Sequence, residues 1–174
     1  MSIVFTPEDD LAIDNRVPTL IQQNNYTIKF VNGSIFDLNV ELITNPVNTV
    51  GVLGKGLAKI FAAKYPKECL VYRQACFHGT LKAGTILVVG AADGKKLAMI
   101  PTKIHWRDKS NLWLVHRGVK ELTTYCSQTG IRTIGLCALG CGCGNLNWPS
   151  VWRTMVSGLQ HSDDLIWTIV FPKE

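Results

Sequence analysis

The sequence predicts one α/β domain in which helices cover both faces of a largely parallel β-sheet. Apolar runs of strand length alternate along the chain with segments of helical periodicity, which is typical of a parallel sheet in a three-layer domain. Several of these runs are apolar throughout, as expected for strands that are covered on both faces. The chain has 174 residues, of which 47% are hydrophobic, and this is enough for a single sizeable core.

The first half of the domain contains two predicted strands and two predicted helical segments. Residues 26–32 alternate apolar and polar side chains and stop at a Gly-Ser pair, which indicates a strand. A short apolar run at 42–43 leads into a glycine-rich loop, after which apolar spacing predicts a helix to residue 64. A proline at position 66 separates it from a second helical segment that runs to about residue 77. The residues predicted to share one face of the first helix are Leu57, Ile60, Phe61 and Tyr65.

The second half repeats the alternation of strands and helices. Apolar runs at 85–89 and 97–100 flank a turn and predict two strands covered on both faces. Apolar spacing predicts a helix over 112–126, and a strand is predicted over 131–139. Asn147 and Pro149 are typical of a helix start, and the last strand is predicted over residues 165–171. The inward residues are predicted to be Leu112, Val115, Val119, Leu122 and Cys126 in the first of these helices, and Val151, Trp152, Met155, Val156 and Leu159 in the second.

Residues 1–24 are predicted to form an N-terminal extension that packs on or leads into a domain of residues 25–174. Within the extension, residues 3–5 have the pattern of a short edge strand. Thr6 is a typical helix cap and is followed by acidic residues in the first turn. Pro18 and the polar run at 22–25 are predicted to end these elements.

Composition and charge exclude several classes of protein. The net charge of +5 suits a phosphate-bearing ligand but is too small and dispersed to indicate nucleic-acid binding by itself. None of the six cysteines forms a C-x-x-C pair, so no metal site is predicted and the thiols are expected to be reduced. The N-terminus lacks the pattern of a signal peptide, and no apolar run approaches the ~20 residues of a membrane span. We therefore expect a cytoplasmic protein that does not contact a membrane.

Three loops that follow predicted strands carry a candidate site. They cover residues 45–56, 101–106 and 140–146. In open α/β sheets ligands bind beyond the carboxyl ends of the strands, so we expect the loops to converge on one cleft. The first loop is rich in glycine and opens a helix, where free N–H groups and the helix dipole favour an anion. The alternative is that its glycines serve only packing.

The motifs in these loops resemble those of a macrodomain, the ADP-ribose-binding α/β/α module. They are NPVNTVGVLGKG at 45–56, PTKIHWR at 101–107 with Ser110 following, and LGCGCGNLNW at 139–148. Within the family they are similar to the branch of DarG antitoxin macrodomains, which remove ADP-ribose from thymidine in DNA. The resemblance covers roughly residues 26–172. It implies a three-layer α/β/α fold with a mixed, largely parallel central sheet.

The resemblance also implies how ADP-ribose would bind, without a cofactor or a metal. Asn48 would hold the hydroxyls of the distal ribose, and residues 54–56 would wrap that ribose and the adjacent phosphate. The glycines of 140–145 would leave N–H groups free for the diphosphate, and adenine would lie near Ser34 and Ile35. The full set of residues expected to contact ADP-ribose is Ser34, Ile35, Asn48, Gly54, Lys55, Gly56, Thr102, His105, Leu139, Gly140, Cys141, Gly142, Cys143, Gly144, Asn145, Leu146 and Phe171. For Phe171, a core position at the end of the last strand is the alternative.

Lys103 is the predicted catalytic residue. In this branch and its vertebrate relatives the matching lysine acts on the anomeric carbon of the distal ribose. A neutral amine can attack that carbon or the opened aldehyde, and Lys55 is a candidate cationic neighbour that would help Lys103 to lose its proton. The alternative is that Lys103 only forms a salt bridge or binds phosphate.

The vertebrate relatives place an acid in the second phosphate loop where this chain, like the DarG-like proteins, has Gly144. The general acid or base is therefore unassigned, and His105 is the only nearby side chain that titrates near neutrality. Trp106 and Trp148 are predicted to be packing residues, with base stacking on single-stranded DNA as the alternative.

Three functions follow as hypotheses. The first is an ADP-ribosyl hydrolase that removes ADP-ribose from thymidine in DNA and so reverses modification by a toxin. The second is a phosphatase acting on ADP-ribose 1″-phosphate with an activated water, and the third is an ADP-ribose reader without turnover. The expected partners are ADP-ribose or ADP-ribosylated single-stranded DNA and a cognate ADP-ribosyltransferase toxin. The protein is expected to be a monomer.

Overall fold

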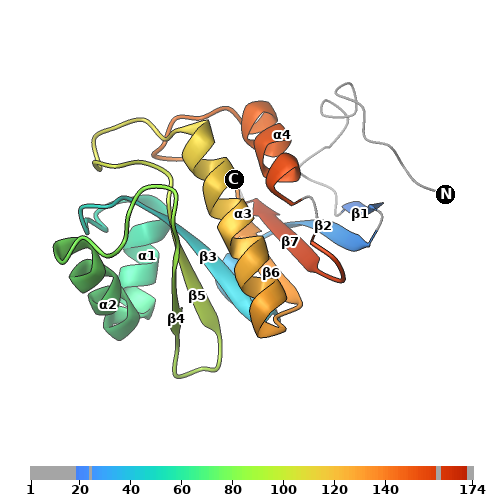
Figure 1. Ribbon diagram of the computed structural model, residues 1–174, viewed down its shortest axis with the longest axis horizontal. Helices are drawn as coiled ribbons and strands as arrows, with labels where there is room; N and C mark the ends of the chain where they lie inside the picture. Colours follow the sequence, from blue (N-terminus) through green and yellow to red (C-terminus); the bar gives the residue numbers. More distant parts are fainter. Residues whose placement is uncertain (1–18, 24, 160–161, 172–174) are drawn as a thin grey trace.

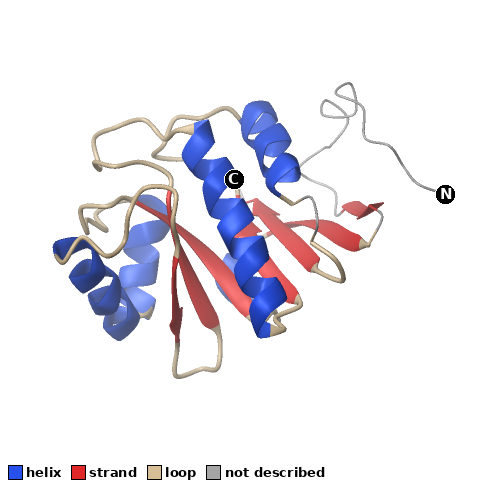
Figure 2. Cartoon of the chain, in the orientation of Figure 1, coloured by secondary structure: helices blue, strands red, loops and turns tan. Residues whose placement is uncertain are grey.

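The computed structural model describes residues 19–23, 25–159 and 162–171 and shows a seven-stranded sheet between two pairs of helices (Figures 1 and 2). The strand order is β1-β2-β7-β6-β3-β5-β4. The five inner strands run parallel to one another, whereas β1 and β4 pair antiparallel at the two edges. The prediction of a three-layer domain with a mixed, largely parallel sheet is confirmed. The strands are β1 (Thr19–Gln23), β2 (Tyr26–Asn32), β3 (Leu42–Val47), β4 (Leu87–Gly90), β5 (Lys96–Pro101), β6 (Thr133–Cys137) and β7 (Ile166–Phe171). The helices are α1 (Gly56–Lys64), α2 (Pro66–Phe77), α3 (Leu112–Thr129) and α4 (Trp148–Gly158), with a 3₁₀ turn η2 at Ile35–Asp37.

Strand β5 shows how the sheet divides the core into two. Its side chains alternate between the faces, and all four of its central residues are fully buried. Leu97 and Met99 belong to the cluster beneath α1 and α2, whereas Ala98 and Ile100 belong to the cluster beneath α3 and α4. A strand in this position must be apolar on both faces, as predicted for the run at 97–100.

Strand β4 departs from the same prediction. It covers Leu87–Gly90 instead of 85–89, and its residues are half-buried or exposed. The strand lies at the sheet edge and pairs only with β5, so its apolar sequence does not reflect cover on both faces. Strand β6 is also shorter than the predicted 131–139, because the chain leaves the ladder at Cys137 and turns into the glycine-rich loop.

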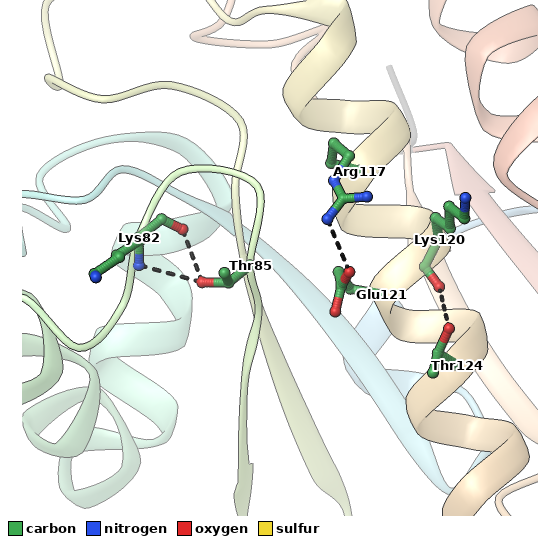
Figure 3. Close-up of polar contacts among 6 residues, drawn as sticks. All are labelled: Lys82, Thr85, Arg117, Lys120, Glu121 and Thr124. Atoms are coloured by element: carbon green, nitrogen blue, oxygen red, sulfur yellow. Dashed lines mark hydrogen bonds and ion pairs between the residues drawn. The ribbon is translucent and has the colours of Figure 1, made fainter.

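Helix α3 packs closely on the sheet and crosses in front of the strands in Figure 1. A Cβ at Gly118 would overlap the side chain of Ile100, so glycine permits this close approach. The outer face of α3 is polar: Arg117 forms a salt bridge with Glu121 (3.1 Å) one turn on, and the Thr124 hydroxyl donates to a main-chain carbonyl of the same helix (Figure 3). Of the predicted inward residues of α3 and α4, all are buried except Leu112 and Val156, which are half-buried.

Helix α1 corrects one prediction on its inward face. Phe61 and Tyr65 are buried and Leu57 is half-buried, but 53% of Ile60 is exposed. Helix α1 ends at Lys64, one residue before the cap residue Tyr65, and the exposed Ile60 faces the cavity described below. Its apolar character therefore reflects the cavity wall and not the core.

The segment assigned to an N-terminal extension contains one described element. Residues 19–23 form β1, which pairs antiparallel with β2 in register Thr19 with Phe30. Sequence patterns missed this strand because it is short and partly polar. The strand predicted at residues 3–5 and the helix start predicted at Thr6 lie outside the described residues. In the described part of the chain, no helix is both long enough and apolar enough to cross a membrane.

Candidate functional site

A cavity of about 680 Å³ opens beyond the carboxyl ends of the parallel strands. The parallel register brings the loops after β2, β3, β5 and β6 to one edge of the sheet. The last three are the loops that were predicted to converge on one cleft. The volume falls in the range of small-molecule and cofactor sites. The predicted site residues that line the cavity are Ser34, Ile35, Lys55, Gly56, Thr102, Lys103, Gly140, Cys141, Gly142, Cys143, Gly144 and Phe171. The lining residues that sequence reasoning did not assign to the site include Phe36, Pro46, Leu57, Ala58, Ile60, Ser110, Cys137, Ala138, Trp148 and Val170.

The loop between β6 and α4 forms the glycine-rich wall of the cavity. Two turns fold it: the N–H of Leu146 donates to Gly140 O (3.0 Å), and the N–H of Asn145 donates to Gly142 O (3.0 Å). Gly140 has φ 78°, a conformation that favours glycine. Among the described residues, the N–H groups of positions 142–144 have no hydrogen-bond partner. Free N–H groups in such a loop are suited to bind a phosphate.

The first turn of α1 faces the same space. Its cap residue Lys55 makes no side-chain cap, so the first N–H groups of the helix are open to a ligand. Gly56 has φ 56°, and a Cβ there would lie 3.2 Å from the Cys143 sulfur, so the two loops are in contact. Together they provide N–H donors and a lysine on two sides of the cavity.

Lys103 lies on the wall between the β5 strand end and the glycine-rich loop. Its Nζ donates to three main-chain carbonyls, those of Cys143 (3.0 Å), Asp108 (3.1 Å) and Trp106 (3.4 Å). The half-buried side chain is therefore fixed in position and tied to the opposite loop. This places an amine at the cavity wall beside the predicted phosphate loop.

Two buried residues with hydroxyl groups line the cavity together with Lys103. Thr102 and Ser110 are 2% and 6% exposed, their hydroxyl oxygens are 2.9 Å apart, and both residues line the cavity. Sequence analysis placed Thr102 in the site but noted Ser110 only as following the second motif. No Asp or Glu among the described residues lines the cavity.

Aromatic residues close the other end of the cavity. The Phe171 ring packs edge-on against Trp148, with centroids 4.8 Å apart at 89°, and both line the cavity. The N–H of Gly33 donates to Phe171 O (2.9 Å), which holds the turn at Ser34 beside this ring. Trp148 also packs on Trp152, so it is both a packing residue, as predicted, and part of the cavity wall.

Asn48 is placed differently from the expectation that it reaches the ribose. It is 5% exposed and does not line the cavity. Its Oδ1 accepts from the N–H groups of Val50 and Val52, and its Nδ2 donates to Val52 O (2.8 Å), so the amide stabilises its own loop. The Tyr72 hydroxyl donates to Asn48 O (2.7 Å) from helix α2, a contact that no sequence signal indicated. Burial raises the pKa of Tyr72, which keeps this donor protonated.

Five further predicted residues do not line the cavity: Gly54, His105, Leu139, Asn145 and Leu146. Leu139 is fully buried in the core and Leu146 packs against it. His105 is used within its own loop, where its Nδ1 accepts from the N–H of Arg107 (3.2 Å). Trp106, predicted to be a packing residue, contacts the His105 ring and the Arg107 guanidinium, but 43% of it is exposed.

The described cysteines are free thiols. Burial raises the pKa of the Cys141 thiol to about 11, so the residue is a neutral wall of the cavity and not a nucleophile. No group of three or more His, Cys, Asp or Glu in the described ranges is arranged to hold a metal ion.

Known proteins are similar to this chain across most of the fold. The profile of the Macro domain family matches residues 44–155. A DNA ADP-ribosyl glycohydrolase of Thermus aquaticus is 36% identical over 136 residues, which is 76% of this chain and 38% of that protein. The macrodomain of Mycobacterium tuberculosis DarG is 34% identical with a TM-score of 0.79, and the match covers 84% of this chain and 98% of that one. Thermosipho africanus DarTG in complex with ADP-ribose is 27% identical with a TM-score of 0.77, covering 88% of this chain and 43% of that one.

The chain spans about two fifths of the length of the curated relatives it matches. The matched region begins within β3 and extends into α4, so it contains three of the four loops that build the cavity, those after β3, β5 and β6. The chain belongs to the Macro domain family.

Proposed function

We propose that this protein is an ADP-ribosyl hydrolase that binds ADP-ribose in the cavity and removes it from thymidine in single-stranded DNA. The observation that carries the proposal is the position of Lys103, whose amine is fixed at the cavity wall 3.0 Å from the carbonyl of Cys143 in the glycine-rich loop. The name of the Thermus aquaticus relative, a DNA ADP-ribosyl glycohydrolase, supports the acceptor.

The cavity suggests one orientation for ADP-ribose. Adenine would lie at the aromatic end, between Ser34 and Phe171. The diphosphate would accept hydrogen bonds from the free N–H groups of residues 142–144 and from the first turn of α1. The distal ribose would then reach Lys103. Asn48 would support this end indirectly, by holding the loop that leads to Lys55 and Gly56.

The proposed reaction is nucleophilic catalysis by Lys103. The neutral amine attacks C1″ of the distal ribose and forms an N–C bond while the bond from C1″ to the thymine nitrogen breaks. The thymine nitrogen takes the proton that the lysine nitrogen loses after the attack. Water then hydrolyses the N–C1″ bond of the lysine adduct, which releases ADP-ribose and regenerates the free amine. In the structure three carbonyls accept from Nζ, so attack requires the amine to lose a proton and to leave at least one carbonyl.

Proton transfer must use groups other than a carboxylate. No acidic residue of the described chain lines the cavity, but the hydroxyl-bearing residues Thr102 and Ser110 line it together with Lys103. We assign these hydroxyls to the positioning of the attacking water. The modified thymidine itself must come from a transferase that acts on DNA, and we propose an ADP-ribosyltransferase toxin as the partner activity.

The test uses a single-stranded oligonucleotide that carries ADP-ribose on one thymidine. We expect the wild type to release unmodified oligonucleotide and ADP-ribose, measured by mass spectrometry. Lys103→Ala should lower the rate by at least about 10³-fold, as is typical when a nucleophile is removed. Calorimetry should show that this variant still binds ADP-ribose. The matched control is Lys120→Ala on the outer face of α3 (Figure 3), which should leave the rate unchanged.

Each other outcome contradicts a defined part of the proposal. An intact adduct after incubation with the wild type would contradict the DNA hydrolase. Full activity of Lys103→Ala, with phosphate released from ADP-ribose 1″-phosphate, would favour the phosphatase. Tight binding of ADP-ribose without turnover of either substrate would leave a reader.

A further inference from the structure

The loop that carries Lys103 also presents an exposed aromatic surface. We call His105, Trp106 and Arg107 the rim platform. The Arg107 guanidinium lies 4.6 Å from the centre of the Trp106 ring, and the His105 ring lies 5.4 Å from it at an angle of 31°. Trp106 nevertheless remains 43% exposed. The ring therefore leaves part of its surface free for a ligand, while its two neighbours hold its orientation.

The rim platform lies beside the proposed reaction centre. The main-chain carbonyl of Trp106 is 3.4 Å from the Nζ of Lys103, and Lys103 lines the cavity. If C1″ of the distal ribose lies at Lys103, the thymidine bonded to C1″ must leave the cavity on this side. The rest of the acceptor therefore passes close to Trp106.

Hydrogen bonds within the loop hold the platform in place. The N–H of His105 donates to the Asp108 carboxylate (2.9 Å), and the N–H of Asp108 donates back to His105 O (3.0 Å). The N–H of Arg107 donates to His105 Nδ1 (3.2 Å). A binding surface that is fixed before the ligand arrives loses less conformational entropy on binding.

The chemistry around the platform suits a nucleic-acid strand. The exposed residues Arg107 and Lys109 bring positive charge. Asp108 lies between them in the sequence, and its carboxylate accepts a hydrogen bond from the N–H of His105. The loop after β3 is joined to this one, because Thr49 donates to Ile104 O through both its N–H (3.0 Å) and its hydroxyl (3.1 Å). The next residue, Val50, adds an exposed apolar side chain. Sites that bind single-stranded nucleic acid combine aromatic side chains, on which bases stack, with positive charges that contact the backbone. The rim platform has both.

We propose that the rim platform binds the acceptor DNA strand, with a base next to the modified thymidine stacked on Trp106 and a strand phosphate contacted by Arg107. This inference rests on the proposed function, since it places the acceptor by the position of Lys103. It makes Trp106 a specificity residue that distinguishes a DNA strand from an isolated modified nucleoside.

The test compares two substrates in the same variants. One is the ADP-ribosylated oligonucleotide, and the other is ADP-ribosylated thymidine without flanking nucleotides. We expect Trp106→Ala to lower the ratio of kcat/KM for the oligonucleotide to kcat/KM for the nucleoside about tenfold, mainly through KM, because base stacking on the ring is lost. Trp106→Phe should restore most of the ratio. Arg107→Ala should lower it less, and its effect should shrink at high salt.

The controls are Trp113→Ala and Arg117→Ala. Trp113 is 60% exposed on α3, and Arg117 pairs with Glu121 on the same helix (Figure 3). Neither residue lines the cavity, so both variants should keep the wild-type ratio. A ratio in Trp106→Ala equal to that in Trp113→Ala would overturn the inference.

Failure of the proposed function is recognised separately. If the wild type hydrolyses neither substrate, binding of an unmodified thymidine oligonucleotide is measured by quenching of tryptophan fluorescence. Weaker binding by Arg107→Ala than by Arg117→Ala would support the strand-binding surface without the reaction. Equal binding by the two variants would overturn it, and the surface would then fit a protein partner better.

Discussion

The Ser110 side chain occupies the space that a side chain at position 144 would need. The Ser110 N–H donates to Gly144 O (2.9 Å), and a Cβ built on Gly144 would overlap both the Ser110 hydroxyl and the carbonyl of Gly140. The backbone clash cannot be relieved by turning a side chain. The vertebrate relatives have an acid at the position of Gly144. An acidic side chain is sterically excluded there in this protein, and the Ser110 hydroxyl occupies that part of the cavity wall.

A methyl group at position 144 should therefore be costly. We expect Gly144→Ala to lower the free energy of unfolding by about 1–3 kcal/mol through overpacking, or about 2–4 °C of Tm for each kcal/mol. ADP-ribose binding should weaken at least tenfold, because the free N–H groups of the loop are displaced. Thermal unfolding and calorimetry measure the two effects. Gly142→Ala is the control in the same loop, since a Cβ at 142 has nothing within 4 Å. Equal effects of the two variants would contradict the steric argument.

The hydroxyl of Tyr72 is predicted to position the first phosphate loop. Tyr72 is fully buried, and its hydroxyl contacts Asn48 O (2.7 Å) and Asn48 Oδ1 (3.2 Å). Tyr72→Phe leaves a buried carbonyl with one donor fewer, which should cost about 1–3 kcal/mol of stability. ADP-ribose affinity should fall by about threefold to tenfold, because the loop that ends at Gly56 is less ordered.

The control for Tyr72 is Tyr65→Phe. The Tyr65 hydroxyl donates to the Asp93 carboxylate (2.9 Å) away from the cavity. This variant should lose stability but keep the wild-type affinity for ADP-ribose. If both variants bind ADP-ribose like the wild type, the Asn48 loop does not depend on Tyr72.

The fold could be predicted because most of its strands and helices have a recognisable apolar pattern in their own segment of the sequence. The run at 97–100 is apolar on both faces and lies between two other strands of the sheet, and the α3 residues Val115 and Val119 are buried as predicted. Edge elements were harder. Strand β4 has the same apolar character as a central strand, and β1 has little apolar character, so only pairing reveals where each lies.

The site was predicted less evenly, for a physical reason. Gly142 and Gly144 act through their backbone N–H groups, so their place at the cavity depends only on the path of the loop. The sequence motif was enough to predict that path. A side chain is different, because its direction depends on tertiary packing. Asn48 turns back to its own loop, and Ser110 enters the cavity from eight residues beyond Thr102. Neither direction is encoded in the local pattern.

Alkylation of Cys143 is predicted to block the cavity. Cys143 is the exposed thiol of the described chain beside Gly56, whereas Cys69 and Cys126 are fully buried. Burial raises the pKa of Cys141 to about 11, so iodoacetamide should modify it more slowly. One equivalent of label on Cys143, located by mass spectrometry, should weaken ADP-ribose binding at least tenfold. Cys143→Ser should bind ADP-ribose and resist the reagent, and unchanged binding by labelled wild type would place Cys143 outside the ligand path.

Glu41 should make part of the stability depend on acid pH. Its carboxylate accepts from the N–H groups of Arg132 and Thr133 and from the Thr133 hydroxyl, each at 2.9 Å. The bond from Arg132 is the main cause that lowers the pKa of Glu41 below its ordinary value near 4.5. A carboxyl group whose pKa is lowered by folding stabilises the protein above its unfolded pKa, and this contribution disappears as pH falls through the folded pKa.

Glu41→Gln tests this dependence. Because Glu41 is exposed, we expect the variant to be less stable by only about 1 kcal/mol at pH 7. The difference should be constant above about pH 5 and should shrink as the pH falls below the ordinary pKa of a glutamate and the wild-type carboxyl takes up its proton. Urea unfolding of both proteins between pH 3 and pH 7 measures it. Glu121→Gln, which breaks the surface pair with Arg117 on α3, is the matched control and should change stability by a few tenths of a kcal/mol at most. A difference that stays constant as the pH falls would contradict the argument, because it would show that the charge accepted by the Arg132 and Thr133 donors is not what stabilises the wild type.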